Sequence, residues 1–310
     1  MEAIKTEKLT KYYGKSRGII DLDLAVEEGE CFGFIGPNGA GKSTTIRTLL
    51  GLIAPTSGSG QIFGMDIVRQ NREILRRVGY IPGEIALPAG LTGWEFLHMM
   101  QHMHCMKDDQ KLNELIDLFE LDPSGETKRM SLGVKRKLAV VSAFMSDPDV
   151  LILDEPTSGL DPVMQEVFIE YIRNEKKRGK TILLSSHIFS EVDATCDRIA
   201  IIKDGRIVSD FIADDLRHAT QKAYRLTFDT PEQMTRFLIE NQNSDVMQIS
   251  ETDPAENTVV ILTDDQYINQ IIDVLSAYSV SGFEHQKETL EDYFMKYYKE
   301  DKNFGGVFQK

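Results

Sequence analysis

The segment Gly36-Pro-Asn-Gly-Ala-Gly-Lys-Ser43 constrains the fold of this chain more than any other part of its sequence. It matches the phosphate-loop pattern, in which a glycine, four further residues and Gly-Lys-Ser or Gly-Lys-Thr curl around phosphate groups. The apolar run at residues 30–35 predicts a buried strand before it, and a helical pattern begins at Ser43. A strand, a glycine-rich loop and a helix in this order predict an α/β fold with an anion site at the helix N-terminus.

The residue types of this loop suit a nucleotide triphosphate. Small residues let the backbone N–H groups surround the phosphates, Lys42 can reach the β- and γ-phosphates, and the Ser43 hydroxyl can bind Mg²⁺. A purely structural glycine turn is the alternative, which the flanking strand and helix disfavour. The residues expected to hold the nucleotide here are Gly36, Pro37, Asn38, Gly39, Ala40, Gly41, Lys42, Ser43 and Thr44.

Two carboxylates follow a second apolar run, Val150-Leu-Ile-Leu-Asp154-Glu155. A buried strand would carry Asp154 to the magnesium side of the phosphate site, and Glu155 would lie where it can polarise an attacking water. An Asp-Glu pair after a strand is often only a helix cap. Together with the phosphate loop, the pair predicts catalysis of phosphate transfer to water.

Length and charge limit the class of protein. The chain has 310 residues, a net charge of −14 and 41% hydrophobic residues, which predicts about two globular domains. No apolar stretch is long enough to cross a membrane, and the first residues lack a secretory pattern. Three scattered cysteines indicate a reducing, cytoplasmic compartment. The negative charge argues against nucleic acid as a partner and against direct membrane insertion.

Patterning predicts a domain boundary at residues 216–220. Residues 1–215 alternate short apolar runs with helical patterns, which is typical of an α/β sheet, and a helical block at about 91–147 interrupts them. Residues 216–310 carry 9 basic and 16 acidic side chains. There the predicted order is β-α-β-β-α-β, as in a small α+β ferredoxin-like domain, followed by a terminal helix at 290–299 and a tail. The strands are expected at 223–228, 246–249, 258–262 and 280–284, and the two helices run to about 241 and from about 265 to 278. Thr230-Pro-Glu-Gln233 predicts the start of the first of these helices.

At Asp154-Glu-Pro-Thr-Ser-Gly-Leu-Asp161, followed by Ser185-Ser-His187, the chain resembles the nucleotide-binding domain of an ATP-binding cassette (ABC) transporter. The resemblance covers about residues 3–210. It implies a P-loop NTPase fold with a RecA-like core and a helical ABC subdomain. The acidic extension, with its ending Thr289-Leu-Glu-Asp-Tyr-Phe294, resembles that of ATPase subunits of ABC-2-type exporters.

The resemblance implies a role for each matching residue. Tyr13 corresponds to the aromatic residue that stacks on adenine, with Tyr12 as the alternative. Asp154 supports Mg²⁺, Glu155 is the general base and His187 contacts the γ-phosphate. The implied catalytic set is Glu155, His187 and Lys42, and the implied metal set is Ser43 and Asp154.

The family's signature sequence maps onto Met130-Ser-Leu-Gly-Val134, which we call the signature segment. The resemblance implies that Ser131 and Gly133 bind the γ-phosphate held by an opposite subunit, in a two-fold homodimer or heterodimer. The usual Leu-Ser-Gly-Gly-Gln has lost one glycine and the glutamine here. A second departure lies at Gly83, where the family usually has glutamine. Glu84 is then a candidate for contact with the metal through water, and an ordinary exposed glutamate is the alternative.

Two weaker features have simpler explanations. His98 and His102 have the spacing of a metal pair, but the surrounding methionines favour a helix packed in the core, or one that faces a partner helix. The basic residues beside the signature segment favour a solvated face, with added positive potential near the phosphates as the alternative. They are Lys128, Arg129, Lys135, Arg136 and Lys137.

The sequence thus predicts an ATPase, with ATP and Mg²⁺ as ligands, that powers transport through separate multi-spanning permease subunits. The permease subunits would hold the ATPase at the cytoplasmic face of the cell membrane, and export is the favoured direction of transport. A non-transport ABC ATPase, an ATP-gated regulatory scaffold and an importer subunit are the alternatives.

Overall fold

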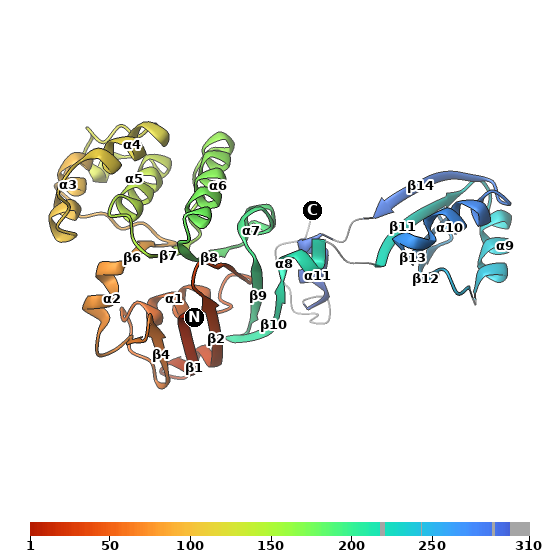
Figure 1. Cartoon of the computed structure of the whole chain (residues 1–310), viewed down its shortest axis with the longest axis horizontal. Coiled ribbons are helices and arrows are strands. Elements are labelled where there is room, and N and C mark those ends of the chain that lie inside the picture. The colour runs from red at the N-terminus through yellow and green to blue at the C-terminus, as the bar shows by residue number, and fades with distance from the viewer. Residues whose placement is uncertain (218–220, 243, 287–288, 298–310) are drawn as a thin grey trace. The chain divides into compact units, whose positions relative to one another are not determined.

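The computed structural model describes residues 1–217, 221–242, 244–286 and 289–297 (Figure 1). The chain divides into two compact units, Met1–Ala213 and Asp214–Lys310. Residues 218–220, inside the predicted boundary, lie outside the described residues, as do 298–299 of the predicted last helix and the tail that follows. Among the described residues, no helix is long and apolar enough to cross a membrane.

The first unit is built on a six-stranded sheet with the order β10-β9-β3-β8-β7-β6. Neighbouring strands from β9 to β6 are parallel, and only β10 pairs antiparallel, with β9. All five residues of β3 and of β7 are buried, as expected for central strands covered on both faces. The strands are β3 (Cys31–Ile35), β6 (Val78–Ile81), β7 (Val150–Asp154), β8 (Thr181–Ser186), β9 (Arg198–Lys203) and β10 (Arg206–Ile212).

A second, antiparallel sheet with the order β2-β1-β4-β5 completes the core of this unit. Its strands are β1 (Glu2–Tyr13), β2 (Ser16–Glu27), β4 (Ser57–Ile62) and β5 (Met65–Asp66). Helix α1 (Lys42–Leu49) lies between the two sheets, because Ile46 and Leu49 belong to one buried cluster with residues of both. Helix α2 (Asn71–Arg77) leads into β6.

Three helices form the predicted helical block, and Figure 1 shows them grouped together beyond β6 and β7. They are α3 (Gly93–Met103), α4 (Gln110–Leu118) and α5 (Leu132–Phe144), with a short 3₁₀ turn at Thr127–Arg129. Thr92 and Glu95 close the N-terminus of α3 with reciprocal hydrogen bonds. Helices α6 (Pro162–Lys177), α7 (Phe189–Thr195) and α8 (Ala213–Arg217) follow along the chain.

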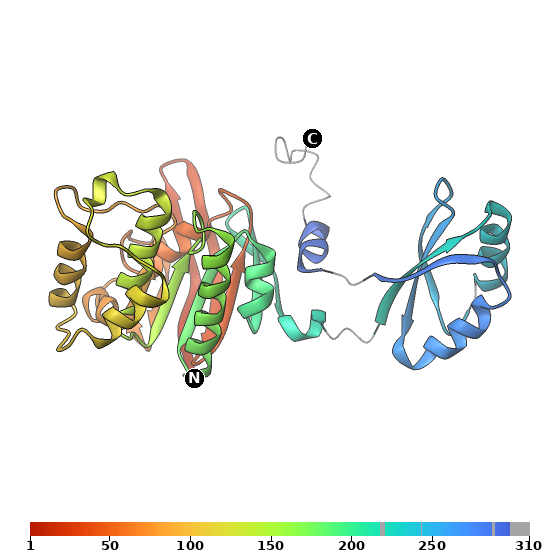
Figure 2. The same ribbon diagram turned by 90° about the horizontal axis from the view of Figure 1, so that it is seen from above.

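The second unit is a four-stranded antiparallel sheet with the order β12-β13-β11-β14 (Figure 2). Its strands are β11 (Gln221–Phe228), β12 (Gln248–Asp253), β13 (Thr258–Asp264) and β14 (Val280–Gln286). Its helices are α9 (Pro231–Asn241), α10 (Ile268–Leu275) after a 3₁₀ turn at Asp265–Tyr267, and α11 (Leu290–Lys296). Phe237 of α9 and Ile271 of α10 pack in one core with Leu226 and Ile261 of the sheet.

Most predicted elements of the second unit occur with shifted ends. Helix α9 begins at Pro231 as predicted, and the Thr230 side chain accepts a hydrogen bond from the backbone N–H of Gln233 at 3.4 Å. The strand predicted at 246–249 begins instead at Gln248 and continues to Asp253. The helix predicted from 265 starts as the 3₁₀ turn and ends at Leu275.

Candidate active site

The strand order of the six-stranded sheet brings the predicted site residues together. Strand β8 lies between β3 and β7, and the three strands are parallel, so their carboxyl ends lie at one edge of the sheet. The phosphate loop follows β3, Asp154 ends β7, and His187 follows β8 directly. Residues that are about 150 positions apart in the sequence therefore share one site.

The phosphate loop is held in a conformation that only glycine adopts easily. Gly41 has a φ of 116°, and a Cβ at this position would lie 2.9 Å from the Gly18 carbonyl oxygen. At Gly36 a Cβ would lie 2.5 Å from the carbonyl oxygen of Ile202. The loop ends at the N-terminus of α1, which follows directly at Lys42. These glycines allow close backbone packing under a loop whose N–H groups can face an anion.

Lys42 is buried at the centre of the site, with 6% of its surface exposed. Its Nζ donates hydrogen bonds to the carbonyl oxygens of Gly36 at 2.5 Å and Pro37 at 3.4 Å. The same nitrogen lies 3.6 Å from Oε1 of Glu155. The ammonium group thus joins the phosphate loop to the carboxylate after β7.

Asp154 is 1% exposed, and only one of its two carboxylate oxygens has a hydrogen-bond partner. The Ser185 hydroxyl donates to Oδ1 at 3.0 Å. Oδ2 is buried without a hydrogen-bond partner in the structure, and a Cβ at Gly83 would lie 3.1 Å from it. A buried carboxylate oxygen without a partner destabilises the folded state unless a cation or a hydrogen-bond donor binds to it. Its chemistry fits Mg²⁺, which prefers oxygen ligands.

Glu155 adopts an uncommon backbone conformation, with a φ of 51°. Its N–H donates to the Ser185 carbonyl oxygen at 2.8 Å, which fixes the turn at the end of β7. Its Oε2 accepts from the His187 backbone N–H at 3.4 Å and is paired with Nδ1 of the His187 ring. Lys42, Glu155 and His187 therefore form a connected chain across three strand ends.

Tyr13 lies at the end of β1, near the start of α1. A Cβ at Gly18 would lie 3.1 Å from Cε2 of Tyr13 and 3.0 Å from Cγ2 of Thr44, so the two side chains border the same glycine. The Tyr13 ring is 47% exposed and the Tyr12 ring 42%. A half-exposed ring beside the phosphate loop is available for stacking.

The signature segment caps α5. The Ser131 side chain accepts a hydrogen bond from the Val134 N–H at 3.3 Å, and Leu132 is 58% exposed. A Cβ at Gly133 would lie 3.1 Å from the Gly159 carbonyl oxygen, so the segment lies beside the loop that follows Glu155. Among the described residues, no hydrogen bond joins Ser131 or Gly133 to the phosphate loop.

Sequence reasoning gave three residues of this region no structural role in the site. Ser185 holds Asp154, and Glu191 of α7 is 1% exposed and accepts a hydrogen bond from the Ser186 hydroxyl at 2.5 Å. Burial raises the pKa of Glu191 to about 7. The third residue, Arg136, is the member of the basic run for which the solvated-face interpretation is wrong, since it is 2% exposed, whereas the other four are exposed or half-buried. Its apolar neighbours at Ala139 and Val140 share one helix face with it, which is the signal that could have revealed its burial.

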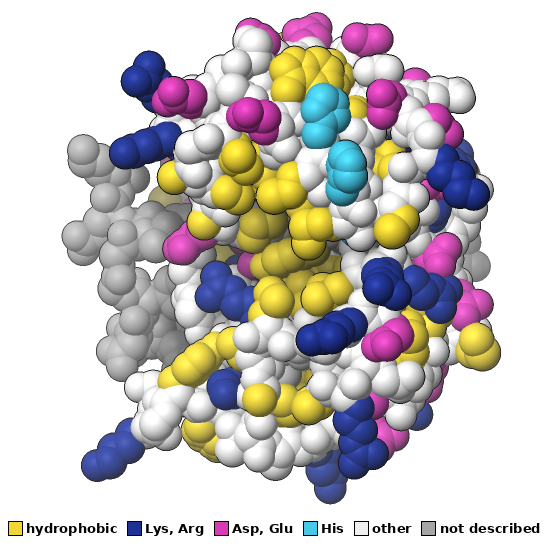
Figure 3. Space-filling model, turned by 90° about the vertical axis from the view of Figure 1, so that its left-hand side faces the viewer, with side chains coloured by type: hydrophobic (Ala, Val, Ile, Leu, Met, Phe, Trp, Pro, Cys, Tyr) yellow, Lys and Arg dark blue, Asp and Glu magenta, His cyan; other side chains and the backbone are white. Residues whose placement is uncertain are grey.

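One face of α3 is exposed, whereas the sequence favoured a helix packed in the core. Met99 is 37% exposed and Met103 66%, while Phe96 and Leu97 point into the protein. Figure 3 shows apolar side chains and two histidines around a hollow on this side of the molecule. His98 stacks on Trp94 at 5.7 Å, and the described residues contain no cluster of three or more His, Cys, Asp or Glu that could hold a metal.

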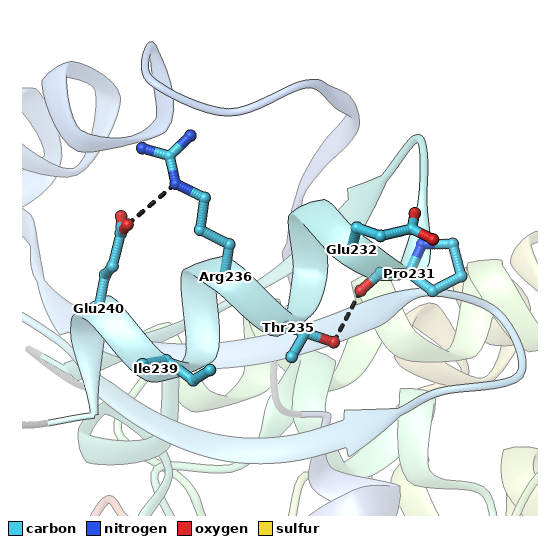
Figure 4. A pocket seen from close by; sticks show the side chains of 6 residues that line it. All are labelled: Pro231, Glu232, Thr235, Arg236, Ile239 and Glu240. Atoms are coloured by element: carbon cyan, nitrogen blue, oxygen red, sulfur yellow. Dashed lines mark hydrogen bonds and ion pairs between the residues drawn. The ribbon is translucent and has the colours of Figure 1, made fainter.

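Glu84, the remaining predicted metal residue, is exposed. A separate pocket of about 600 Å³ lies on α9 in the second unit (Figure 4). It is lined by Pro231, Glu232, Thr235, Arg236, Ile239 and Glu240, none of which is a predicted site residue.

A phosphate loop, its lysine and a buried carboxylate pair at neighbouring parallel strand ends define a P-loop ATPase. The family model described as "ABC transporter" matches residues 19–158. The bacitracin transport ATP-binding protein BcrA of Bacillus licheniformis is 35% identical over 299 residues, which cover 94% of this chain and 96% of that protein. The chain belongs to the ABC transporter family and is an ATP-binding subunit that hydrolyses ATP to power transport.

Two further proteins agree with this assignment. The daunorubicin/doxorubicin resistance ATP-binding protein DrrA of Streptomyces peucetius is 37% identical over 220 residues, or 69% of this chain and 67% of that protein. A solved structure titled "Structure of ATP binding subunit of ABC transporter" is 32% identical and has a TM-score of 0.66. It covers 70% of this chain and 92% of that chain.

Proposed function

We infer that this chain powers export through separate membrane subunits, with the hydrolytic roles carried by the residues named above. The observation that carries this proposal is the chain of contacts from Lys42 through Glu155 to His187, beside the buried Asp154. The direction of transport rests on relatives named for bacitracin transport and drug resistance.

Each side chain has a role in hydrolysis. The N–H groups of residues 36–44 would bind the phosphates, and Tyr13 would stack on adenine. Lys42 would exchange its bonds to Gly36 and Pro37 for the β- and γ-phosphates. Glu155 would then accept a proton from the attacking water, while His187 holds the carboxylate and contacts the γ-phosphate.

Asp154 and Ser43 would hold Mg²⁺, with Glu84 as a candidate contact through water. When bound, Mg²⁺ neutralises charge on the β- and γ-phosphate oxygens. The unpartnered Oδ2 of Asp154 supports this assignment, because a buried carboxylate oxygen is otherwise costly.

Ser131 and Gly133 would complete the site of a second subunit in a head-to-tail dimer. They begin a helix, whose N-terminal N–H groups suit a phosphate. Two ATP molecules would then close a homodimer or heterodimer, and hydrolysis would reopen it. The exposed methionines of α3 suit contact with a membrane subunit, because their side chains adapt to a partner helix. This contact would keep the protein at the cytoplasmic face of the membrane.

Residues 1–215 would form the ATP-binding domain and residues 216–310 an acidic accessory domain. The element order β-α-β-β-α-β and the strand order β12-β13-β11-β14 support a ferredoxin-like fold for the accessory domain. Its role would be regulatory or structural, since it contains none of the phosphate-site motifs.

Glu155→Gln tests the mechanism. The variant keeps the shape of the side chain but cannot accept the proton, so we expect ATP binding and an ATP-trapped dimer, with turnover at least about 10²-fold lower. ATP hydrolysis by this variant at the wild-type rate would show that Glu155 is not the base. Wild-type protein that binds ATP without steady-state hydrolysis would favour a regulatory scaffold instead. Co-purification from native membranes with a multi-spanning protein tests the transport role.

A further inference from the structure

Arg136 has a position that the roles above do not explain. It lies on α5, two residues after the signature segment, and it is the largest of the fully buried side chains among the described residues. Burying a guanidinium costs several kcal/mol unless hydrogen bonds and nearby charges compensate it. An apolar side chain would fill the same space without that cost. The position of a charged group here therefore requires an explanation from its contacts.

The guanidinium of Arg136 binds three backbone carbonyl oxygens from two different loops. Nη1 donates to Pro82 and Nη2 to Gly83, both at 2.8 Å, and Nε donates to Ser158, also at 2.8 Å. Only arginine has donors in this planar fork, since lysine presents a single point charge. One side chain thus fixes α5 to the loop after β6 and to the loop after β7.

Both loops contact the residues that carry the catalytic carboxylates, one at the Asp154 side chain and the other at the Glu155 backbone. Gly83 packs against the unpartnered Oδ2 of Asp154, where a Cβ would lie 3.1 Å away. The Ser158 N–H donates to the Glu155 carbonyl oxygen at 3.2 Å. Arg136 is therefore one contact removed from Asp154 on one side and from Glu155 on the other.

The charge of Arg136 faces the same carboxylates. Burial lowers the pKa of the guanidinium, whereas the negative charges of Asp154, Glu155 and Glu191 act to raise it. Gly83 has no side chain that could link its loop to the metal side of the site. Instead, the loop is linked to α5 by the hydrogen bond from Arg136 to the Gly83 carbonyl oxygen.

We propose that Arg136 is a positioning residue for ATP hydrolysis, which couples α5 and its signature segment to the loops that place Asp154 and Glu155. A displacement of α5 would move Gly83 and Ser158 with it and so change the geometry of the two carboxylates. This proposal rests on the proposed function, because it assigns Arg136 a part in the same hydrolytic site.

The test compares ATP hydrolysis by the full-length wild-type protein with that of Arg136→Met and Arg136→Lys. We expect Arg136→Met to lower kcat at least about tenfold, since small displacements of catalytic groups have large effects on rate. KM for ATP should stay within about threefold, because the three Arg136 hydrogen bonds go to Pro82, Gly83 and Ser158, which lie outside the phosphate loop. Arg136→Lys keeps the charge without the fork, so its kcat should lie between the two.

Arg173→Met is the matched control. Arg173 also donates to a backbone carbonyl oxygen, that of Ala194 at 3.0 Å, but it is 45% exposed and lies on α6. We expect its kcat to equal that of the wild type. Folding of each variant is followed in urea by the fluorescence of Trp94, the single tryptophan.

Three outcomes would overturn the proposal. If Arg136→Met keeps the wild-type kcat, the coupling role is wrong while the proposed function stands. If both variants fail to fold, or lose kcat only in proportion to their folded fraction, Arg136 serves the stability of the fold alone. If the wild-type protein itself hydrolyses no ATP, the proposed function fails first, and the role of Arg136 fails with it.

Discussion

Substituting the buried Glu191 by glutamine should change how the stability of the first unit depends on pH. Burial raises the pKa of Glu191 in the folded protein to about 7, from an ordinary value of 4.5. Between these values the folded state binds more protons than the unfolded state, so stability falls as pH rises through this range. The stabilising contribution is fully present below pH 4.5 and is lost above about pH 7.

The magnitude follows from the size of the shift. A pKa that is about 2.5 higher in the folded than in the unfolded state lowers the free energy of unfolding by about 3 kcal/mol at high pH. About 1 kcal/mol of this loss is already present at pH 5. Glutamine keeps an oxygen that can accept from Ser186 and carries no charge. The stability difference between Glu191→Gln and wild type should therefore increase by about 2 kcal/mol, in favour of the variant, from pH 5 to pH 8.5.

Urea unfolding followed by Trp94 fluorescence measures this difference, because the only tryptophan lies in the first unit. With about 2–3 kcal/mol per molar urea, the expected change is about 0.7–1 M in midpoint. Glu166→Gln, at an exposed position of α6, controls for the loss of one carboxylate. Parallel pH profiles for Glu191→Gln and wild type would refute the reasoning, whatever the constant offset between them.

Three further predictions concern other parts of the molecule. Lys42→Ala should weaken ATP binding at least about tenfold in calorimetry, since hydrogen bonds to charged groups contribute about 1.5–3 kcal/mol; unchanged affinity would contradict its role. Gly41→Ala should lower the urea midpoint more than Gly39→Ala. Both glycines have a positive φ, but only at Gly41 would an added Cβ meet neighbouring atoms. Equal midpoints for the two variants would disprove this. Phe237→Ala should destabilise the second unit by about 3–5 kcal/mol in differential scanning calorimetry and leave the Trp94 transition in place, whereas a shift of that transition would contradict independent unfolding.

The strands that carry the site were predictable because each is a short, fully buried apolar run that ends at a polar motif. The runs before Gly36 and up to Asp154 occur as β3 and β7. The antiparallel sheet was not predicted. In β1 the pairing with β2 shifts at Thr6/Leu9, and this irregularity interrupts the two-residue alternation by which a half-buried strand is recognised.

The local sequence also did not determine whether individual side chains are buried or exposed. Arg136 stands among five basic residues, and only the packing of α5 shows that it faces inward to three carbonyl oxygens. The methionines of α3 give the opposite case, since their apolar character favoured the core and Met103 lies on the surface. Burial depends on which elements pack against a helix face, and this information is not contained in the helix itself.

By itself, the sequence determined the phosphate loop and its lysine, because consecutive residues fix a strand, a tight glycine turn and a helix N-terminus without help from elsewhere. The tertiary structure decided which groups meet that loop. The contact of Lys42 with Glu155, and of Glu155 with His187, exists because β8 lies between β3 and β7 in one parallel sheet. Strand order depends on long-range pairing, since β3 and its neighbour β8 are separated by more than a hundred positions of chain.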